Sequence, residues 1–102
     1  MSKAKTNHLL SESQLELVAL RFRALGEPMR LRILQSICNQ PRTVNEIAHA
    51  VGAGQANVSK HLTLLAAANI LTREKDGQHV IYSLKDSLVL KLCKTVCAHL
   101  EV

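Results

Sequence analysis

The stretch TVNEIAHAVGAGQANVSKHLTLL, residues 43–65, decides the fold. It opens with Thr43 and Glu46, the S/T-x-x-E pattern of a capping box, in which a hydroxyl and a carboxylate satisfy backbone N–H groups at the start of a helix. The apolar residues Ile47, Ala48 and Val51 follow before Gly52, and glycine commonly comes just after the last turn of a helix. The first half of the stretch therefore predicts a short helix.

The second half predicts another helix, which begins at Gln55. Its apolar residues recur at the spacing of a single helix face, and they are Val58, Leu62 and Leu65. Its polar residues lie largely outside that face, and they are Gln55, Asn57, Ser59, Lys60, His61 and Thr63. Two short helices joined by a tight turn that contains glycine, the second of them polar on its outer face, form a helix-turn-helix signature.

The flanking segments predict three more helices. One starts behind a Ser11 N-cap and stops at Gly26, and the next has Pro28 in its first turn and runs to Cys38. The last helix is capped by Asp86. Its apolar stripe consists of Leu88, Val89, Leu92, Cys93, Val96, Cys97 and Leu100.

A β-hairpin is expected between the second half of the helix-turn-helix and the last helix. Residues 70–75 and 78–84 read as strands on either side of Asp76-Gly77, a dipeptide suited to a two-residue turn because both positions tolerate positive φ. The predicted fold is therefore mostly α with a small β-hairpin. It is a winged helix-turn-helix of five helices and a two-stranded wing.

Composition and charge narrow the choice of partner. The 102 residues suit one small domain over residues 11–102, behind a polar and flexible leader at residues 1–10. Thirteen Lys and Arg against eight Asp and Glu give a formal charge of +5, which favours a polyanionic partner. Aromatic residues make up only 2% of the chain, so base stacking, the usual mode of single-strand binding, is not available.

No apolar run suits a secretory signal or a membrane span, so we expect a cytoplasmic protein without a membrane partner.

These features predict a protein that binds double-stranded DNA. A helix fits the major groove, and side chains near its start can reach the base edges. The predicted contacts from the second helix are its polar residues, Gln55, Asn57, Ser59, Lys60, His61 and Thr63, and those from the wing are Arg73, Lys75, Gln78 and His79. A winged helix used only for protein association is the alternative, and Lys60, Arg73 and Lys75 argue against it. We expect no enzyme activity, because the sequence has neither a convergent nucleophile and base nor a phosphate loop.

The sequence also resembles the ArsR/SmtB family of bacterial metal- and stress-responsive repressors. The resemblance lies in RALGEPMRLRIL at residues 23–34, QANVSKHL at residues 55–62 and the Asp-Gly hairpin that ends in VIY at residues 80–82. It implies a homodimer formed by the first and last helices, which would bind an inverted-repeat operator and release it in response to an inducer. The apolar stripe on the last helix supports this dimer, because so small a domain has little core to cover it.

The metal sites of that family are incomplete in this sequence. The resemblance places a metalloid-binding Cys-x-Cys on the third helix, where this chain reads EIAHAV at residues 46–51. The zinc pattern on the last helix falls on Asp86, Leu88, His99 and Val102, of which only Asp86 and His99 can bind a metal. Zinc in a structural site is normally bound by four protein ligands, so we expect this site to be degenerate.

Cys38, Cys93 and Cys97 are the candidate sensor residues. The persulfide-sensing branch of the family has one cysteine on the second helix and one late in the last helix, and Cys38 with Cys93 or Cys97 resembles this arrangement. In that branch, however, the first cysteine stands where this chain has Gln35. Cys93 and Cys97 are four residues apart, so they are neighbours on one helix face. Their thiolates could bind a soft metal or metalloid ion, the only cofactor the sequence leaves open, or undergo redox or persulfide chemistry. The third interpretation is that the cysteines only pack in the apolar stripe and that the regulator has no inducer.

Overall fold

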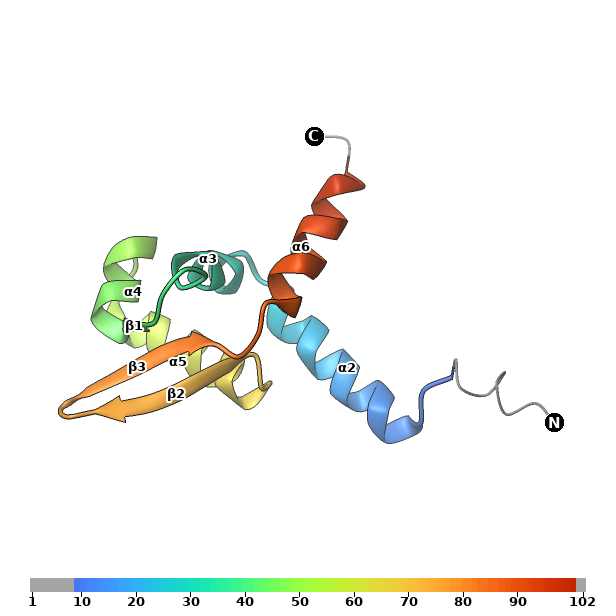
Figure 1. The fold of residues 1–102 in the computed structure, drawn as a ribbon, viewed down its shortest axis with the longest axis horizontal. Coiled ribbons are helices and arrows are strands. Elements are labelled where there is room, and N and C mark those ends of the chain that lie inside the picture. The colour runs from blue at the N-terminus through green and yellow to red at the C-terminus, as the bar shows by residue number, and fades with distance from the viewer. Residues whose placement is uncertain (1–8, 101–102) are drawn as a thin grey trace.

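The structure is a computed structural model, and it describes residues 9–100 (Figure 1). Its elements follow in the order α2 (Glu12–Leu25), α3 (Pro28–Ser36), β1 (Arg42–Thr43), α4 (Val44–Val51), α5 (Gln55–Ala67), β2 (Leu71–Asp76), β3 (His79–Leu84) and α6 (Leu88–Ala98). The predicted fold class is confirmed, with five helices in the described part of the chain. The predicted leader lies mostly in residues 1–8, outside the described residues, and stays a prediction.

The predicted Ser11 N-cap of α2 and the predicted capping box of α4 are confirmed, and the start of α2 is a capping box as well. The Ser11 hydroxyl accepts a hydrogen bond from the Gln14 N–H at 3.1 Å, and the Gln14 side-chain oxygen accepts one from the Ser11 N–H at 2.9 Å. Thr43 and Glu46 make the same reciprocal pair, at 3.2 and 2.9 Å. Gly52 ends α4 in the left-handed conformation, with φ of 69°. Local sequence chemistry therefore sets these boundaries.

Helix α3 differs from the prediction at its end, and α6 differs at both ends. Helix α3 was expected to reach Cys38, but it ends at Ser36, because the next two N–H groups bond to the carbonyls three residues before them and so tighten the chain into a turn. At the start of α6, the Asp86 carboxylate accepts from the Leu88 N–H at 2.8 Å, although the N-cap position itself falls on Ser87. Leu100, the last residue of the predicted stripe, lies beyond the helix.

The wing differs from the prediction in two respects. It has three strands in the order β1-β3-β2, all antiparallel, because Arg42 and Thr43 pair with Tyr82 and Ile81. A two-residue strand leaves no periodic signal in the sequence. The turn is also shifted by one residue: Asp76 pairs with His79, so the turn residues are Gly77 and Gln78. Only Gly77 has a positive φ, 64°, so the turn uses glycine at its first central position, as in a type II′ hairpin.

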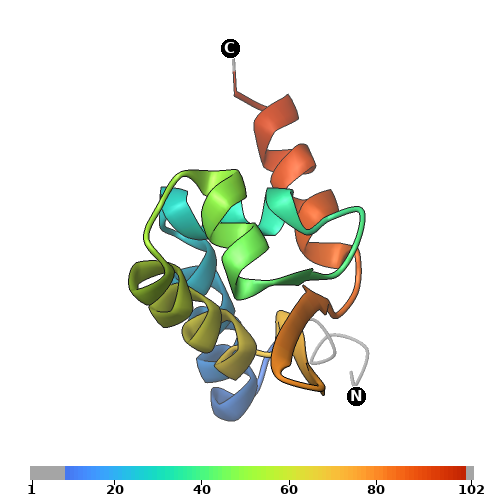
Figure 2. The same ribbon diagram turned by 90° about the vertical axis from the view of Figure 1, so that its left-hand side faces the viewer.

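The core lies where α3, α4, α5 and the sheet meet. Its largest fully buried side chains are Ile33, Leu34, Ile37, Ile47, Val58, Leu62 and Leu65. Figure 2 looks onto the end of the molecule that carries α4, α5 and the hairpin tip, and α6 rises behind them. Helices α2 and α6 extend from the other end (Figure 1). No helix within residues 9–100 is long and apolar enough to cross a membrane.

The core predicts a sharp contrast between two leucines of α5. Leu62 is 0% exposed and Leu64 is 39% exposed. Leu62→Ala should lower the free energy of unfolding by about 2–5 kcal/mol, because it leaves a cavity in a packed core. Leu64→Ala is the matched control and should cost much less. Urea denaturation of the two variants measures the difference, and equal losses would contradict the assignment of the core face.

Candidate nucleic-acid interface and thiol groove

The outer side of α5 carries the polar residues predicted to contact DNA. Three apolar side chains on the inner side, Val58, Leu62 and Leu65, are fully buried, and they fix how the helix is turned about its axis. On the outer side, Gln55, Asn57, Lys60 and Thr63 are exposed, and Ser59 and His61 are half-buried. The Thr63 hydroxyl donates to the Ser59 carbonyl at 2.9 Å, which leaves its oxygen free to accept. Contact of these residues with DNA remains a prediction.

Two of these side chains are held by residues outside the predicted contact set, Asn45 and Arg30. The Gln55 Nε2 group donates to Asn45 Oδ1 at 2.7 Å, so the amide at the start of α5 is tied to α4. His61 Nδ1 lies 3.2 Å from Arg30 Nη1 of α3. Each pair joins residues at least ten positions apart in the chain, so helical periodicity carries no signal for it.

The strand register divides the predicted wing contacts between two faces. Residues directly opposite one another on paired strands share a face of the sheet. Arg73 lies opposite Tyr82, which is only 5% exposed, and Lys75 lies opposite Val80, which packs against the core. Both cations therefore belong to the face of the sheet that packs on the core, and they extend it toward the tip. His79 lies opposite Asp76 on the other face, and Gln78 is in the turn.

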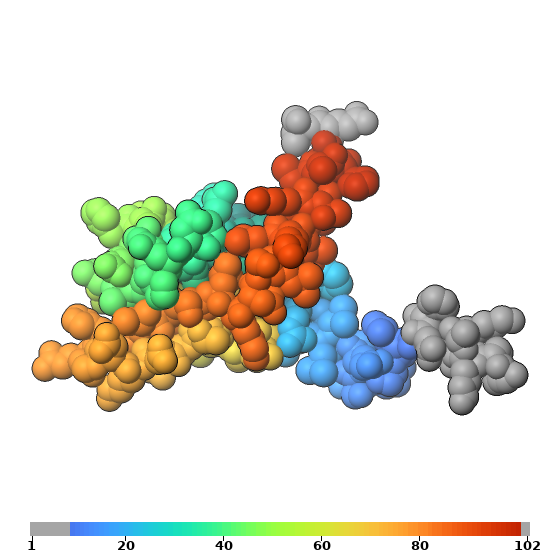
Figure 3. Space-filling model, viewed as in Figure 1, coloured from blue at the N-terminus to red at the C-terminus, as the bar shows by residue number. Residues whose placement is uncertain are grey.

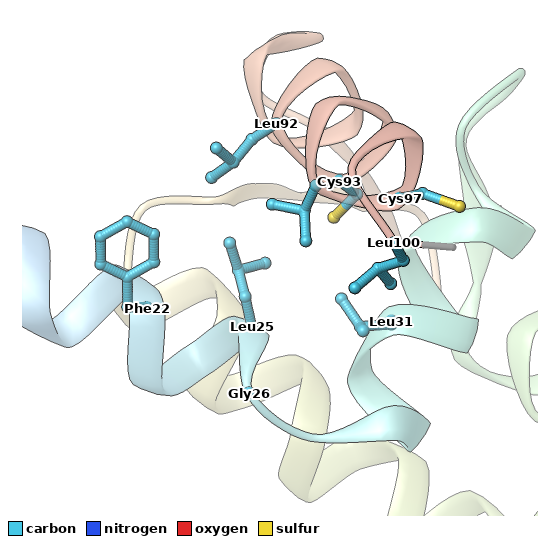
Figure 4. A pocket seen from close by; sticks show the side chains of 9 residues that line it. Phe22, Leu25, Gly26, Leu31, Leu92, Cys93, Cys97 and Leu100 are labelled. Atoms are coloured by element: carbon cyan, nitrogen blue, oxygen red, sulfur yellow. The ribbon is translucent and has the colours of Figure 1, made fainter. Parts of the chain in front are cut away.

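A cavity of about 390 Å³ lies between α2, α3 and α6 (Figure 4). Its walls are apolar apart from two thiols, and its lining consists of Phe22, Leu25, Gly26, Leu31, Leu92, Cys93, Val96, Cys97 and Leu100. In Figure 4 the sulfur of Cys93 points toward this cavity, whereas the sulfur of Cys97 points away from it. The two sulfurs thus diverge, although their residues are neighbours on one helix.

A second groove, of about 520 Å³, brings all three cysteines together. It runs between α3 and α6, and its lining includes Cys38, Cys93 and Cys97. Arg32 and Lys94 also line it, so cationic groups flank the thiols. Cys38 and Cys93 are half-buried and Cys97 is exposed. The groove therefore combines three free thiols with access from solvent in the isolated subunit.

Comparison with known proteins assigns the family. The sequence model described as "Bacterial regulatory protein, arsR family" matches residues 27–73, which include the helix-turn-helix. The chain is 31% identical over 93 residues to a transcriptional repressor, the SmtB homologue of Synechocystis, and this match covers 91% of the chain and 70% of the relative. The chain belongs to the ArsR family. It is also 36% identical to the nodulation protein NolR of Rhizobium meliloti, over 76% of the chain and 63% of that relative.

The fold agrees with a solved structure that is described as a possible ArsR-family transcriptional regulator. The chain is similar to a homodimeric winged helix-turn-helix DNA-binding domain from Mycobacterium bovis, with a TM-score of 0.79 and 27% identity. The similarity covers 91% of this chain and 93% of the other. An ArsR-type winged helix-turn-helix is therefore found by both sequence and structure.

Asp86 and His99, the two residues that remain of the ArsR zinc pattern, make hydrogen bonds at the two ends of α6. The Asp86 carboxylate accepts from the Leu88 N–H, and His99 Nδ1 lies 3.0 Å from the Thr95 carbonyl oxygen at the end of α6. Val102 lies outside the described residues. Within residues 9–100, no group of three His, Cys, Asp or Glu side chains is placed to hold one metal ion.

Proposed function

We propose that this chain is a homodimeric repressor that binds an inverted-repeat operator in double-stranded DNA. The observation that carries the proposal is the surface shared by α5 and the wing. The polar side of α5 faces outward, and β2, which packs against α5, continues with Arg73 and Lys75 on the same side of the sheet as the core. Such a surface offers base-reading side chains next to cations for phosphates.

The apolar surface of α2 and α6 supports the dimer. Helix α6 has no buried residue in the isolated subunit, Phe22 is 57% exposed and Val96 is 53% exposed. These two helices project from the rest of the molecule (Figure 3), so a second copy can cover both. Burial of this surface is favourable by roughly 25 cal/mol per Å². In a two-fold dimer, two copies of α5 would read half-sites about one turn of DNA apart.

The operator can be identified by selecting bound duplexes from a random double-stranded library with the purified protein. We expect the enriched sequences to be inverted repeats, because two-fold protein symmetry imposes the same symmetry on the site. Enrichment of no sequence from the duplex library would overturn the proposed function.

Removing one wing cation should make operator binding less sensitive to salt. Each phosphate contact contributes about −0.9 to the slope of log affinity against log salt, so Lys75→Gln should make the slope shallower by about 2 in a dimer. Lys91→Gln, on the exposed surface of α6, removes the same charge far from the wing and should leave the slope unchanged. The slopes come from fluorescence anisotropy titrations on the selected duplex. Equal slopes for the two variants would contradict a phosphate contact by the wing.

A charge on the apolar side of α6 should separate the subunits. Val96→Glu would bury a carboxylate in the proposed interface, whereas Val96 is exposed in the single subunit, so the fold of the subunit should survive. Ala98→Glu is the matched control, because Ala98 is also exposed and lies on nearly the opposite side of the same helix. Sedimentation velocity should find monomers for Val96→Glu and dimers for Ala98→Glu. Dimers of both variants would place the interface elsewhere.

For regulation, we propose that modification of the groove thiols releases the DNA. The thiols of Cys38, Cys93 and Cys97 line one groove, and α3 forms one side of it. Because α3 also packs against α5, a chemical change in the groove would shift the helix that is proposed to contact DNA. One suitable reaction is oxidation of two thiols by a hydroperoxide. A disulfide forms, the O–O bond breaks, and the products are an alcohol and water.

The double substitution Cys93→Ser and Cys97→Ser should leave operator affinity intact and abolish its loss on treatment. Wild-type protein and the variant are treated with hydroperoxide, a persulfide donor, zinc or arsenite, and binding is measured by anisotropy. Release of the wild type by the first two reagents supports thiol modification, and release by zinc or arsenite alone indicates that the cysteines bind an ion instead. Identical release of the variant and the wild type would reject cysteine sensing.

A further inference from the structure

The Arg30 side chain joins three helices through its guanidinium group. Its Nε donates to the Ala24 carbonyl at 2.6 Å, and its Nη2 donates to the Arg23 carbonyl at 3.1 Å. Its third nitrogen, Nη1, lies 3.2 Å from Nδ1 of His61. Arg30 itself stands in the first turn of α3, so one planar group connects α3 with the end of α2 and the middle of α5.

The contacts at the end of α2 hold the guanidinium in place. The last carbonyls of a helix have no partner within the helix, and a cation near them is also favoured by the helix dipole. Arg30 donates to two carbonyls at this helix end at once, those of Ala24 and Arg23, and the Arg23 carbonyl also accepts from the Gly26 N–H. The planar fork of an arginine fixes the direction of each donor, whereas the three donors of a lysine ammonium group rotate. The position of Nη1, the nitrogen that meets His61, therefore follows from the position of α2.

The contact with His61 determines the state of the imidazole. A guanidinium group only donates hydrogen bonds, so Nδ1 of His61 must accept. An imidazole that accepts at Nδ1 is neutral and carries its hydrogen on Nε2. His61 is half-buried on α5, among the side chains predicted to contact DNA.

We propose that Arg30 is a positioning residue for DNA reading: it holds His61 as a neutral imidazole whose Nε2–H donates to a hydrogen-bond acceptor on the duplex. The acceptor is a phosphate oxygen or an acceptor atom on a base edge, and both chemistries need the same donor. The DNA half of this inference rests on the proposed function. The state of the imidazole is a property of the free protein.

The imidazole is tested first, without DNA, by ¹⁵N NMR of the histidine rings. The wild-type His61 signal, assigned by its loss in His61→Asn, should be that of the neutral Nε2–H form. Arg30→Met keeps the length of the side chain and removes all its donors, so this signal should shift toward a mixture of tautomers. Arg32→Met, on the same helix, is the control and should leave the signal unchanged. A wild-type His61 that is protonated or carries its hydrogen on Nδ1, or a signal unaffected by Arg30→Met, would overturn the inference.

Operator binding is tested next by a double-mutant cycle with Arg30→Met and His61→Phe. Each single variant should weaken binding about tenfold, as expected for the loss of one hydrogen bond that involves a charged or well-placed group. The double variant should be no weaker than the weaker single variant, because both changes remove the same donor. Losses that multiply would show that the two residues act separately and would overturn the proposal.

A comparison of two duplexes distinguishes the acceptors. A phosphate contact should weaken binding to the selected operator and to poly(dI-dC) by the same factor, and a base contact should weaken the operator alone. Arg30→Lys keeps the charge without the fork and serves if Arg30→Met does not fold. It should show the same NMR shift and affinity loss, and wild-type behaviour would refute positioning by the fork. If the wild type binds no duplex, the proposed function fails while the NMR result still decides the state of His61.

Discussion

Burial of one side of α5 is the constraint on which the rest of the structure depends. Val58, Leu62 and Leu65 are completely removed from solvent, and a helix that buries three residues at this spacing has only one orientation about its axis. The same packing brings α3, α4 and the sheet together around the helix. The polar side of α5 is consequently turned outward, so the core that stabilises the domain also presents its reading surface.

Hydrogen bonds from neighbouring helices then restrict the polar side chains. Asn45 on α4 holds the amide of Gln55, and Arg30 on α3 holds the ring of His61. Side chains fixed before binding lose less conformational entropy when a partner arrives. The polar side chains of α5 are therefore positioned by three helices, although they belong to one.

The terminal helices connect this surface with the thiols. The end of α2 supplies both the wall of the apolar cavity, through Leu25 and Gly26, and the carbonyls that hold Arg30. Cys93 lies on the opposite wall of that cavity, and it also lines the groove next to α3. Helix α3 thus lies between the candidate sensor cysteines and α5, because it lines their groove and also packs against α5.

The sequence by itself determined the features that depend on neighbours along the chain. The capping boxes at Ser11 and Thr43, the glycine at the end of α4 and the apolar face of α5 are all local, since each involves residues within one or a few helical turns. Only the tertiary structure decided the third strand of the wing, the division of Lys75 and His79 between two faces, and the contacts of Asn45 and Arg30. These depend on segments that meet only after folding, and neither helical period nor strand alternation records which distant residue arrives. The grouping of Cys38 with Cys93 and Cys97 in one groove was decided in the same way, because the spacing of the residues does not show that α3 and α6 line the same groove.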